Sequence, residues 1–483
     1  MSDLRRAARG TLLASFAGPS LPGWIVRQAG DGLGGVCLYG SNRHAELAAV
    51  AADLHAARPS LVVALDEEGG DVTRIEATTG SSLPGNAALG AVDDPALTTA
   101  VAVALGDRLR GLGVDLDLAP CADVNSDPAN PVIGVRSFGA DPADVARHTA
   151  AFVIGLQSAG VAACAKHFPG HGAARVDSHL ALPTVEVGET ELAPFRSAIA
   201  AGVAAVMPGH LLVPALDDAS ASVSPRILDD LLRGELGFGG AIVTDALDMG
   251  AIGGPAGIPA AVVRALAAGA DLCCLGPDNT EDLLDACLDT IAAAVAAGTL
   301  AESRVHEAAE RVAALSAACA PRGQVGPPTD LAALGADAAR RALRVDGDIP
   351  AALAGAHVVE LARPANIAAG SVPWGAAASI LRRDPAATTT RVAEGDDHAV
   401  ASALLAAGGR PLVVVTRDAP RRPAQAAALR TLLAARPDAV LVDMGWPAGD
   451  ALPPAAARIT TYGASPACGE AAATVLLGRI PCG

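Results

Sequence analysis

Short apolar runs recur along this 483-residue chain between Gly35 and Leu275, and segments with helical character separate them. Most of the runs are continuous rather than alternating, which is typical of parallel strands covered on both faces. Strands that alternate with helices favour a barrel of the (β/α)8 TIM type. The strand candidates are Gly35–Tyr39, Leu61–Leu65, Val114–Leu118, Val161–Ala165, Ala204–Met207, Ala241–Thr244 and Asp271–Leu275.

Helix candidates fill the gaps, among them Pro95–Gly111, Pro142–Ala159 and Glu189–Ala201. The first two begin with Asp-Pro, an N-cap residue followed by the imino acid favoured at the first helical position. The remaining barrel strand is expected near Ile252–Ala268. The segment Thr11–Gly18 is too short for a signal peptide, and we expect it to begin a helix.

A Gly/Pro-rich break at Ala320–Pro328 is expected to end the first domain. We predict a catalytic barrel at 1–320, a linker at 321–344 and a smaller α/β domain, an αβα sandwich, at 345–483. The strand candidates of this second domain are Val358–Leu361, Pro411–Thr416 and Ala439–Asp443.

The net charge and the cysteines limit which binding partners and which cellular compartment are expected. The net charge of −17 argues against nucleic acid and against anionic membranes as partners. Apolar runs are interrupted by Gly or a charge before they reach the length of a membrane span. The nine cysteines are scattered, several of them in apolar runs, which indicates reduced thiols and a cytoplasmic location.

The segment KHFPGHGAARVDSHLAL, which follows the fourth strand candidate, carries an unusual density of proton-transfer groups. A packed core would not select such a set, because buried charges and imidazoles are unfavourable unless paired. The carboxyl ends of barrel strands are where such folds keep their chemistry. The polar members are Lys166, His167, His171, Asp177 and His179.

Two carboxylates in this chain are candidates for catalysis. Asp177 lies two residues before His179, a spacing that lets a carboxylate orient an imidazole for proton transfer, although it also suits a simple turn cap. Asp245 ends a buried strand candidate and could attack an anomeric carbon, bind a metal or cap a helix. Asp248 competes with Asp245 for these roles.

Further polar residues follow other strand candidates. Asp66 and Arg74, in LDEEGGDVTR, could bind sugar hydroxyls, while Arg136 and His210 lie at what we expect to be strand ends. Each of these alone is more often structural than functional. These side chains suit either a glycosidase or a zinc-dependent amidohydrolase-like barrel. The sequence lacks the His-x-His pair that such a zinc barrel carries at the end of an early strand, which weakens the second hypothesis. The zinc ligands would come from His167, His171, His179, His210 and Asp245.

The ordered motifs DEEGGDVTR, GVRSFG, KHFPGHG, DSH and VTDALDM resemble those of family 3 glycoside hydrolases over about residues 10 to 320. The DSH element is similar to that of the β-N-acetylglucosaminidase branch. The resemblance implies a retaining mechanism with Asp245 as nucleophile and His179 as general acid/base, assisted by Asp177. It further implies a −1 subsite formed by Asp66, Arg74, Arg136, Lys166, His167 and His210.

We therefore expect an exo-β-N-acetylglucosaminidase that needs no cofactor or metal and acts on muropeptides or chitooligosaccharides. Three alternatives remain open: a β-glucosidase or β-xylosidase of the same family, the metal-dependent hydrolase, and a non-catalytic sugar-binding or scaffold protein. Phosphate could replace water in the second step, because a neutral imidazole repels anions less than a carboxylate does. The sequence assigns no oligomeric state and no role to the second domain.

Overall fold

The computed structural model describes residues 3–40, 42, 44–319, 330–351, 353–362 and 370–478. The first part of the predicted linker, residues 321–329, lies outside them. Contacts divide the chain into two compact units. The first comprises Met1–Glu67, Pro95–Ile133 and Gly139–Thr329, and the second comprises Glu68–Asp94, Gly134–Phe138 and Asp330–Gly483.

The first unit is built on eight parallel strands in the order β7-β6-β5-β4-β3-β2-β1-β8. A parallel bridge between Val243 and Leu272 joins the two outer strands, so the sheet closes into the predicted barrel. Its interior is filled by buried apolar side chains from every strand. The strands are β1 (Leu12–Ala14), β2 (Gly35–Leu38), β3 (Val62–Leu65), β4 (Leu116–Asp117), β5 (Ala162–Phe168), β6 (Ala205–Pro208), β7 (Ala241–Ile242) and β8 (Cys273–Cys274).

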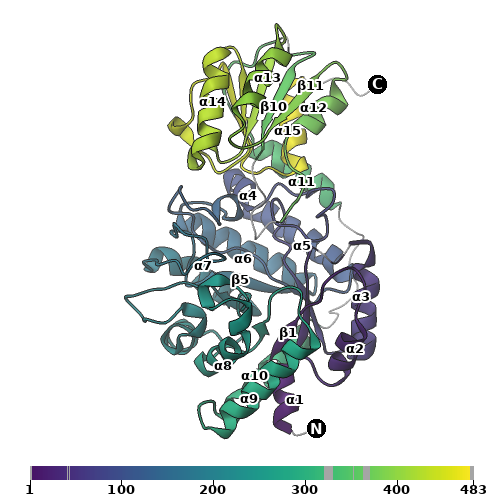
Figure 1. The fold of residues 1–483 in the computed structure, drawn as a ribbon, viewed down its shortest axis with the longest axis vertical. Helices are drawn as coiled ribbons and strands as arrows, with labels where there is room; N and C mark the ends of the chain where they lie inside the picture. Colours follow the sequence, from purple (N-terminus) through teal and green to yellow (C-terminus); the bar gives the residue numbers. More distant parts are fainter. Residues whose placement is uncertain are drawn as a thin grey trace. The chain divides into compact units, whose positions relative to one another are not determined.

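Helices surround this barrel (Figure 1), and the three helices predicted above are confirmed within one residue at each end. They are α1 (Asp3–Gly10), α2 (Gly23–Gly30), α3 (His44–Ala57), α5 (Pro95–Gly111), α6 (Pro142–Ser158), α7 (Glu189–Ala200), α8 (Ile258–Ala268), α9 (Glu281–Ala296) and α10 (Glu302–Ala318), with a π-helix at Arg226–Glu235. Asp141 caps α6 as its Asp-Pro start predicts, accepting hydrogen bonds from two backbone N–H groups.

Two sequence-based assignments in this unit are wrong. The segment expected to begin a helix holds the fully buried strand β1, which pairs with a parallel neighbour on each side. A three-residue strand of this kind depends on its partners rather than on local preference. The strand expected near Ile252–Ala268 is the helix α8, which has Pro259 in its first turn and Gly269 in a left-handed conformation after its end.

The second unit contains a six-stranded sheet in the order β11-β10-β12-β13-β14-β9, in which β9 alone runs antiparallel to its neighbour. Successive residues of its strands face two separate apolar cores: Val358 and Val413 pack on one face, and Val359 and Val414 on the other. Helices α12 and α15 cover the first face and α13 and α14 the second, so the predicted αβα arrangement is confirmed (Figure 1). The strands are β9 (Arg344–Gly347), β10 (His357–Leu361), β11 (Thr388–Val392), β12 (Leu412–Thr416), β13 (Val440–Asp443) and β14 (Ala457–Thr460).

The helices of the second unit are α4 (Asn86–Val92), α11 (Leu331–Ala342), α12 (Ala377–Arg383), α13 (Asp397–Ala407), α14 (Pro423–Ala435) and α15 (Pro466–Leu476). Helix α11 lies in the stretch predicted as linker, and the segments 68–94 and 134–138 group with this unit rather than with the barrel. The domain boundaries at 320 and 345 stay a prediction. In the described part of the chain, every helix is too short or too polar to cross a membrane.

Candidate active site

Candidate side chains in the first unit follow different barrel strands or lie near the carboxyl end of a strand. Asp66 follows β3, His210 comes shortly after β6, and Asp245 follows β7, whereas Lys166 and His167 belong to β5 itself, which is longer than predicted. Because the strands are parallel, their carboxyl ends share one rim of the barrel. The folded chain thus brings these groups to one end.

Lys166 and Asp66 form a close ion pair at this rim. The Nζ atom of Lys166 lies 2.6 Å from Oδ1 of Asp66, and the lysine side chain is almost fully buried. A buried ammonium needs such a partner, because desolvation without one is unfavourable. The pair holds Asp66, which is partly exposed, in a fixed orientation from which it can accept hydrogen bonds from a ligand.

Asp245 is held in its ionised form by its surroundings. Burial raises the pKa of this carboxyl, but the electrostatic interactions with His210, His167 and His179 and a hydrogen bond from the Ala246 backbone outweigh it and lower the pKa to about 2. A carboxylate that stays ionised at neutral pH is available as a nucleophile.

His210 fixes the chain that follows this carboxylate. Its Nε2 lies 2.9 Å from the carbonyl oxygen of Ala246, and its Nδ1 lies 2.7 Å from Oγ of Ser222. A carbonyl only accepts, so Nε2 carries the proton and, in the neutral ring, Nδ1 accepts from the serine hydroxyl. Complete burial lowers the pKa of His210, while the charge of Asp245 raises it, with a net decrease. His210 therefore holds the backbone next to Asp245 in place through the Ala246 carbonyl.

Asp248, the competing carboxylate, is packed against the segment after β8. A Cβ placed on Gly276 would collide with its carboxyl group. Burial and the neighbouring negative charge of Asp245 raise the pKa of Asp248. Of the two carboxylates, Asp245 is thus the one whose surroundings favour the ionised form.

Asp177 and His179 form a carboxylate–imidazole dyad in the loop after β5. Oδ1 of Asp177 lies 2.7 Å from Nδ1 of His179 and also accepts a hydrogen bond from the His179 backbone N–H at 2.9 Å. Burial raises the pKa of Asp177, but these bonds to His179 lower it by a larger amount, so the pKa of Asp177 lies below its usual value. With Nδ1 donating to Asp177, proton exchange falls to Nε2. Both side chains are about one-fifth exposed, so the dyad remains open to a ligand.

Asp123 and His167 form a second carboxylate–imidazole dyad, which the sequence analysis did not predict. Asp123, which is fully buried, accepts from Nδ1 of His167 at 2.8 Å and from the backbone N–H groups of His167 and His171. Burial raises the pKa of Asp123, but the interactions with His167 and His171 give a net decrease. A lone aspartate in the stretch after β4 offers no motif by which sequence reasoning could find it.

Asp117, on β4, is a further buried carboxylate that the sequence did not single out. Its Oδ1 accepts from the backbone of Glu67 at 2.9 Å, while its Oδ2 has no hydrogen-bond partner among the described residues. Burial, together with the neighbouring acids, raises the pKa of Asp117 well above its usual range. Its surroundings therefore favour the neutral form of this carboxyl.

The predicted zinc-binding set is not assembled as a metal centre. Within the described ranges, the one group whose ligand atoms lie within 4.8 Å of each other is Cys121, Asp123 and His167. In that group Oδ2 of Asp123 already accepts from the Cys121 thiol at 3.2 Å and from His167. The donors are thus used in hydrogen bonds, which favours a structural over a metal-binding arrangement.

Arg74 and Arg136 belong to the second compact unit. Arg136 lies in a short 3-10 helix, Gly134–Arg136, so its placement at a strand end is wrong. Its guanidinium makes a bidentate ion pair with the buried carboxylate of Glu68 at 2.7 and 2.8 Å.

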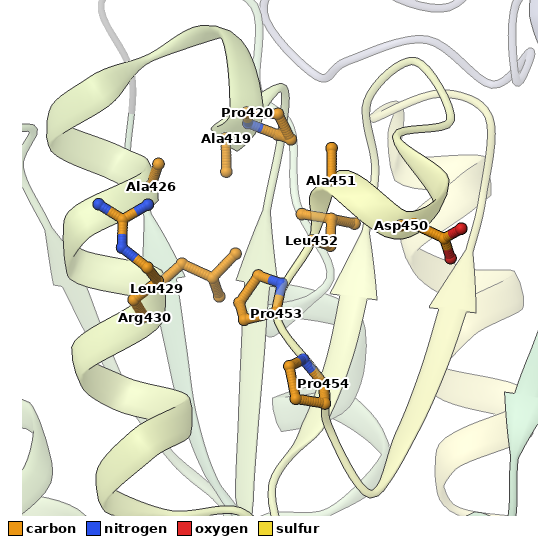
Figure 2. Close-up of a pocket in the computed structure, with 10 residues that line it drawn as sticks. All are labelled: Ala419, Pro420, Ala426, Leu429, Arg430, Asp450, Ala451, Leu452, Pro453 and Pro454. Carbon is orange, nitrogen blue, oxygen red and sulfur yellow. The ribbon is translucent and has the colours of Figure 1, made fainter.

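The second unit also carries a surface pocket of about 330 Å³ between helix α14 and the segment before β14 (Figure 2). Its walls are mainly apolar, with one arginine and one aspartate, and none of the candidate site residues lines it. The lining residues are Ala419, Pro420, Ala426, Leu429, Arg430, Asp450, Ala451, Leu452, Pro453 and Pro454.

A parallel barrel with an ionised carboxylate and a carboxylate–imidazole dyad at its carboxyl-terminal rim is typical of a hydrolase that works by nucleophilic and acid–base catalysis. A family model described as the glycosyl hydrolase family 3 N-terminal domain matches residues 29–315. The chain therefore belongs to glycosyl hydrolase family 3 and is a glycoside hydrolase.

Relatives and solved structures agree with this assignment. A β-hexosaminidase from Thiobacillus denitrificans is 37% identical over 316 residues, which cover 62% of this chain and 87% of the relative. A β-hexosaminidase from Neisseria meningitidis is 38% identical over 269 residues, covering 52% of this chain and 74% of the relative. The structure of a family 3 β-N-acetylglucosaminidase from a Paenibacillus species matches 99% of this chain and 97% of its own, with a TM-score of 0.89 and 32% identity.

Proposed function

We propose that the protein is an exo-β-N-acetylglucosaminidase that removes terminal N-acetylglucosamine by a retaining double displacement. The observation that carries the proposal is the joint presence of ionised Asp245 and the Asp177–His179 dyad at one barrel rim. The names of the relatives support the choice of hexosaminide substrates. Muropeptides are the favoured natural substrates and chitooligosaccharides the second, and the former would place the enzyme in the cytoplasm.

In the first step, the Asp245 carboxylate attacks the anomeric carbon while the glycosidic C–O bond breaks. The leaving oxygen takes a proton from Nε2 of His179, and the Asp177 carboxylate stabilises the protonated imidazole before the transfer. The result is a glycosyl ester on Asp245 and a free aglycone. Asp66, Lys166 and His167 are proposed to hold the sugar hydroxyls, and a contribution of Arg74 and Arg136 stays a prediction from the family resemblance.

In the second step, neutral His179 takes a proton from water, and the resulting hydroxide attacks the same carbon and releases the Asp245 carboxylate. Two inversions give net retention. The chemistry of these two steps needs only the carboxylate and the imidazole.

Turnover of 4-nitrophenyl β-N-acetylglucosaminide, compared with the corresponding glucoside and xyloside, tests the substrate class. We expect a strong preference for the N-acetylglucosaminide, and equal or better turnover of the glucoside or xyloside would replace the proposal by those activities. Retained activity in EDTA would argue against a metal-dependent hydrolase.

The nucleophile is tested by Asp245→Ala, which should lower kcat by several orders of magnitude without lowering the melting temperature appreciably. Asp248→Asn is the matched control, because it changes the neighbouring carboxylate, and we expect it to retain most activity. A 5-fluoro analogue of an activated N-acetylglucosaminide should label a peptide containing Asp245. Near-normal rates for Asp245→Ala, or labelling of another carboxylate, would contradict the assignment.

A second candidate activity is phosphorolysis. The base of the second step is an imidazole rather than a carboxylate, so an anionic acceptor meets less repulsion there. The same assay run with added phosphate distinguishes the two reactions, since phosphorolysis yields N-acetylglucosamine 1-phosphate in place of the free sugar.

A further inference from the structure

The loop that carries the dyad has a buried side chain between the two dyad members. Among residues 175 to 180, Ser178 is buried, whereas Val176 and Leu180 are exposed and Asp177 and His179 are half-buried. The bonds between Asp177 and His179 shape the turn but do not fix it to the barrel. The loop is attached to the rest of the unit by a backbone bond, from the Gly250 N–H to the His179 carbonyl at 3.3 Å, and by the exposed Arg175 side chain, which pairs with Asp127 at 2.7 Å. Ser178 supplies the buried side-chain contact.

Ser178 contacts His171, a residue that the proposed mechanism does not use. Oγ of Ser178 lies 3.1 Å from Nε2 of His171, and both side chains are buried. They are seven positions apart in the chain, so the bond closes the loop onto the strand-end turn KHFPGHG. A hydroxyl–imidazole bond that is shielded from water holds its geometry better than one at the surface.

His171 is itself held by the unpredicted carboxylate under the loop. Its backbone N–H donates to Oδ1 of Asp123 at 2.7 Å, and its carbonyl accepts from Nδ2 of Asn130 at 2.8 Å. The ring also packs edge-on against His167, with 5.8 Å between ring centroids. A Cβ on Gly172 would collide with the Val124 carbonyl, so the turn lies directly against the Asp123 segment.

We propose that His171 and Ser178 are positioning residues for the general acid/base: the buried bond between them fixes the loop so that His179 meets the glycosidic oxygen. This inference rests on the proposed function. An otherwise exposed loop samples many conformations, and a catalytic group misplaced by about 1 Å can lose on the order of 10²-fold in rate. The bond matters most where a proton must be delivered to a poor leaving group.

The test uses two variants that break this bond from opposite ends, Ser178→Ala and His171→Phe. For each, kcat/KM is measured on chitobiose, whose leaving sugar needs a proton, and on the 4-nitrophenyl glycoside, whose leaving group needs far less assistance. We expect a loss on chitobiose of about tenfold to 10²-fold, and a clearly smaller loss on the aryl glycoside. The double variant should lose no more than the worse single variant, because both remove one bond.

The matched control is Thr98→Val, which removes another buried hydroxyl–imidazole bond, 2.8 Å long, between Thr98 and His148 of helices α5 and α6. It should lower the melting temperature without changing the ratio of the two substrates. Equal losses on both substrates in the Ser178 and His171 variants, or additive losses in the double variant, would overturn the positioning role. In that case an active wild type would still support the proposed function, whereas a wild type inactive on every N-acetylglucosaminide would overturn both.

Discussion

At the scale of single residues, the first unit uses one bonding pattern twice with different burial. In both dyads a carboxylate accepts from Nδ1 of a histidine, at 2.8 Å in Asp123–His167 and 2.7 Å in Asp177–His179. Asp123 is fully buried and receives several further hydrogen bonds, which suits the proposed sugar-binding role of His167, because they hold the ring fixed. The second dyad is partly open, which suits a ring that must gain and lose a proton.

The charge of Asp177 can be tested separately from its hydrogen bonds. Asp177→Asn keeps an oxygen able to accept from His179 but removes the negative charge that stabilises the protonated ring. We expect kcat/KM for chitobiose to fall on the order of 10²-fold. Asp127→Asn is the control, because it also removes one negative charge, from a carboxylate that pairs with the exposed Arg175 of the same loop. Similar effects of the two substitutions would show that general surface charge, not the dyad, is responsible.

Sequence reasoning found the polar groups of the rim but not those that hold them. Asp66, Lys166 and Asp245 are recognisable because polar residues directly after apolar runs mark strand ends. His179 is recognisable by its spacing from Asp177. Asp123 is different, since its partners come from β5 and the following turn, more than forty positions along the chain. The role of Ser178 depends likewise on a buried contact with His171 that local spacing does not reveal.

At the scale of elements, the barrel is stabilised at its other end by a buried carboxylate shared among arginines. Asp271 precedes β8 and has no exposed surface. It accepts from Arg233 at 2.6 Å, from Arg304, from Arg311 at 3.3 Å, and from the backbone of Ile242 on β7. It thus joins the two strands that close the barrel. Because this end lies opposite the catalytic rim, we expect the cluster to affect stability rather than activity.

Asp271→Asn keeps the acceptor for Ile242 but leaves the guanidinium groups without their shared charge. Removing one partner from a buried ionic cluster typically costs about 3–5 kcal/mol in the free energy of unfolding. Urea unfolding should show a loss of this size. Asp285→Asn, which breaks a largely exposed pair with Arg5, should cost less than about 1 kcal/mol. A loss for Asp271→Asn no larger than for this control would contradict the assigned role.

The elements that sequence reasoning missed are those with the least local information. Helix α5 was predicted with its observed bounds, because seventeen residues and an Asp-Pro start leave few alternatives. Strand β1 has three residues, so its pairing with β8 depends on a partner distant in sequence. The helix α8 was mistaken for a strand because it is short and rich in apolar residues, and such runs are ambiguous by periodicity.

At the scale of the whole molecule, the two compact units carry different spectroscopic reporters. Trp24 lies in the first unit, and Trp374 and Trp446 lie in the second. In a Trp24→Phe background, tryptophan fluorescence would report on the second unit alone. The stability of each unit can therefore be followed in the full-length protein.

The second unit contains a buried acid whose ionisation should set its pH dependence. The pKa of Asp443 is raised to about 7, chiefly by burial. The hydrogen bond from the Gly445 backbone N–H partly offsets this increase, and the charge of Asp418 adds to it. Oδ2 of Asp443 and the hydroxyl of Thr416, its partner across β12 and β13, have no hydrogen-bond partner among the described residues. The folded form thus binds a proton more tightly than the unfolded chain, whose aspartates titrate near pH ~3.9.

The contribution of this bound proton to the free energy of unfolding is fully present below the pKa that Asp443 has in the unfolded chain. It is lost as the pH rises through the pKa of Asp443 in the folded unit, near 7. Asp443→Asn imitates the protonated acid and should escape this loss. In the Trp24→Phe background we expect the variant to gain roughly 2–4 kcal/mol over its parent at pH 8 and progressively less toward pH 4. Urea unfolding followed by fluorescence across this range measures the difference. A gain that does not change with pH, or a destabilised variant at pH 8, would show that Asp443 is ionised in the folded unit and held by Arg421 and Arg458.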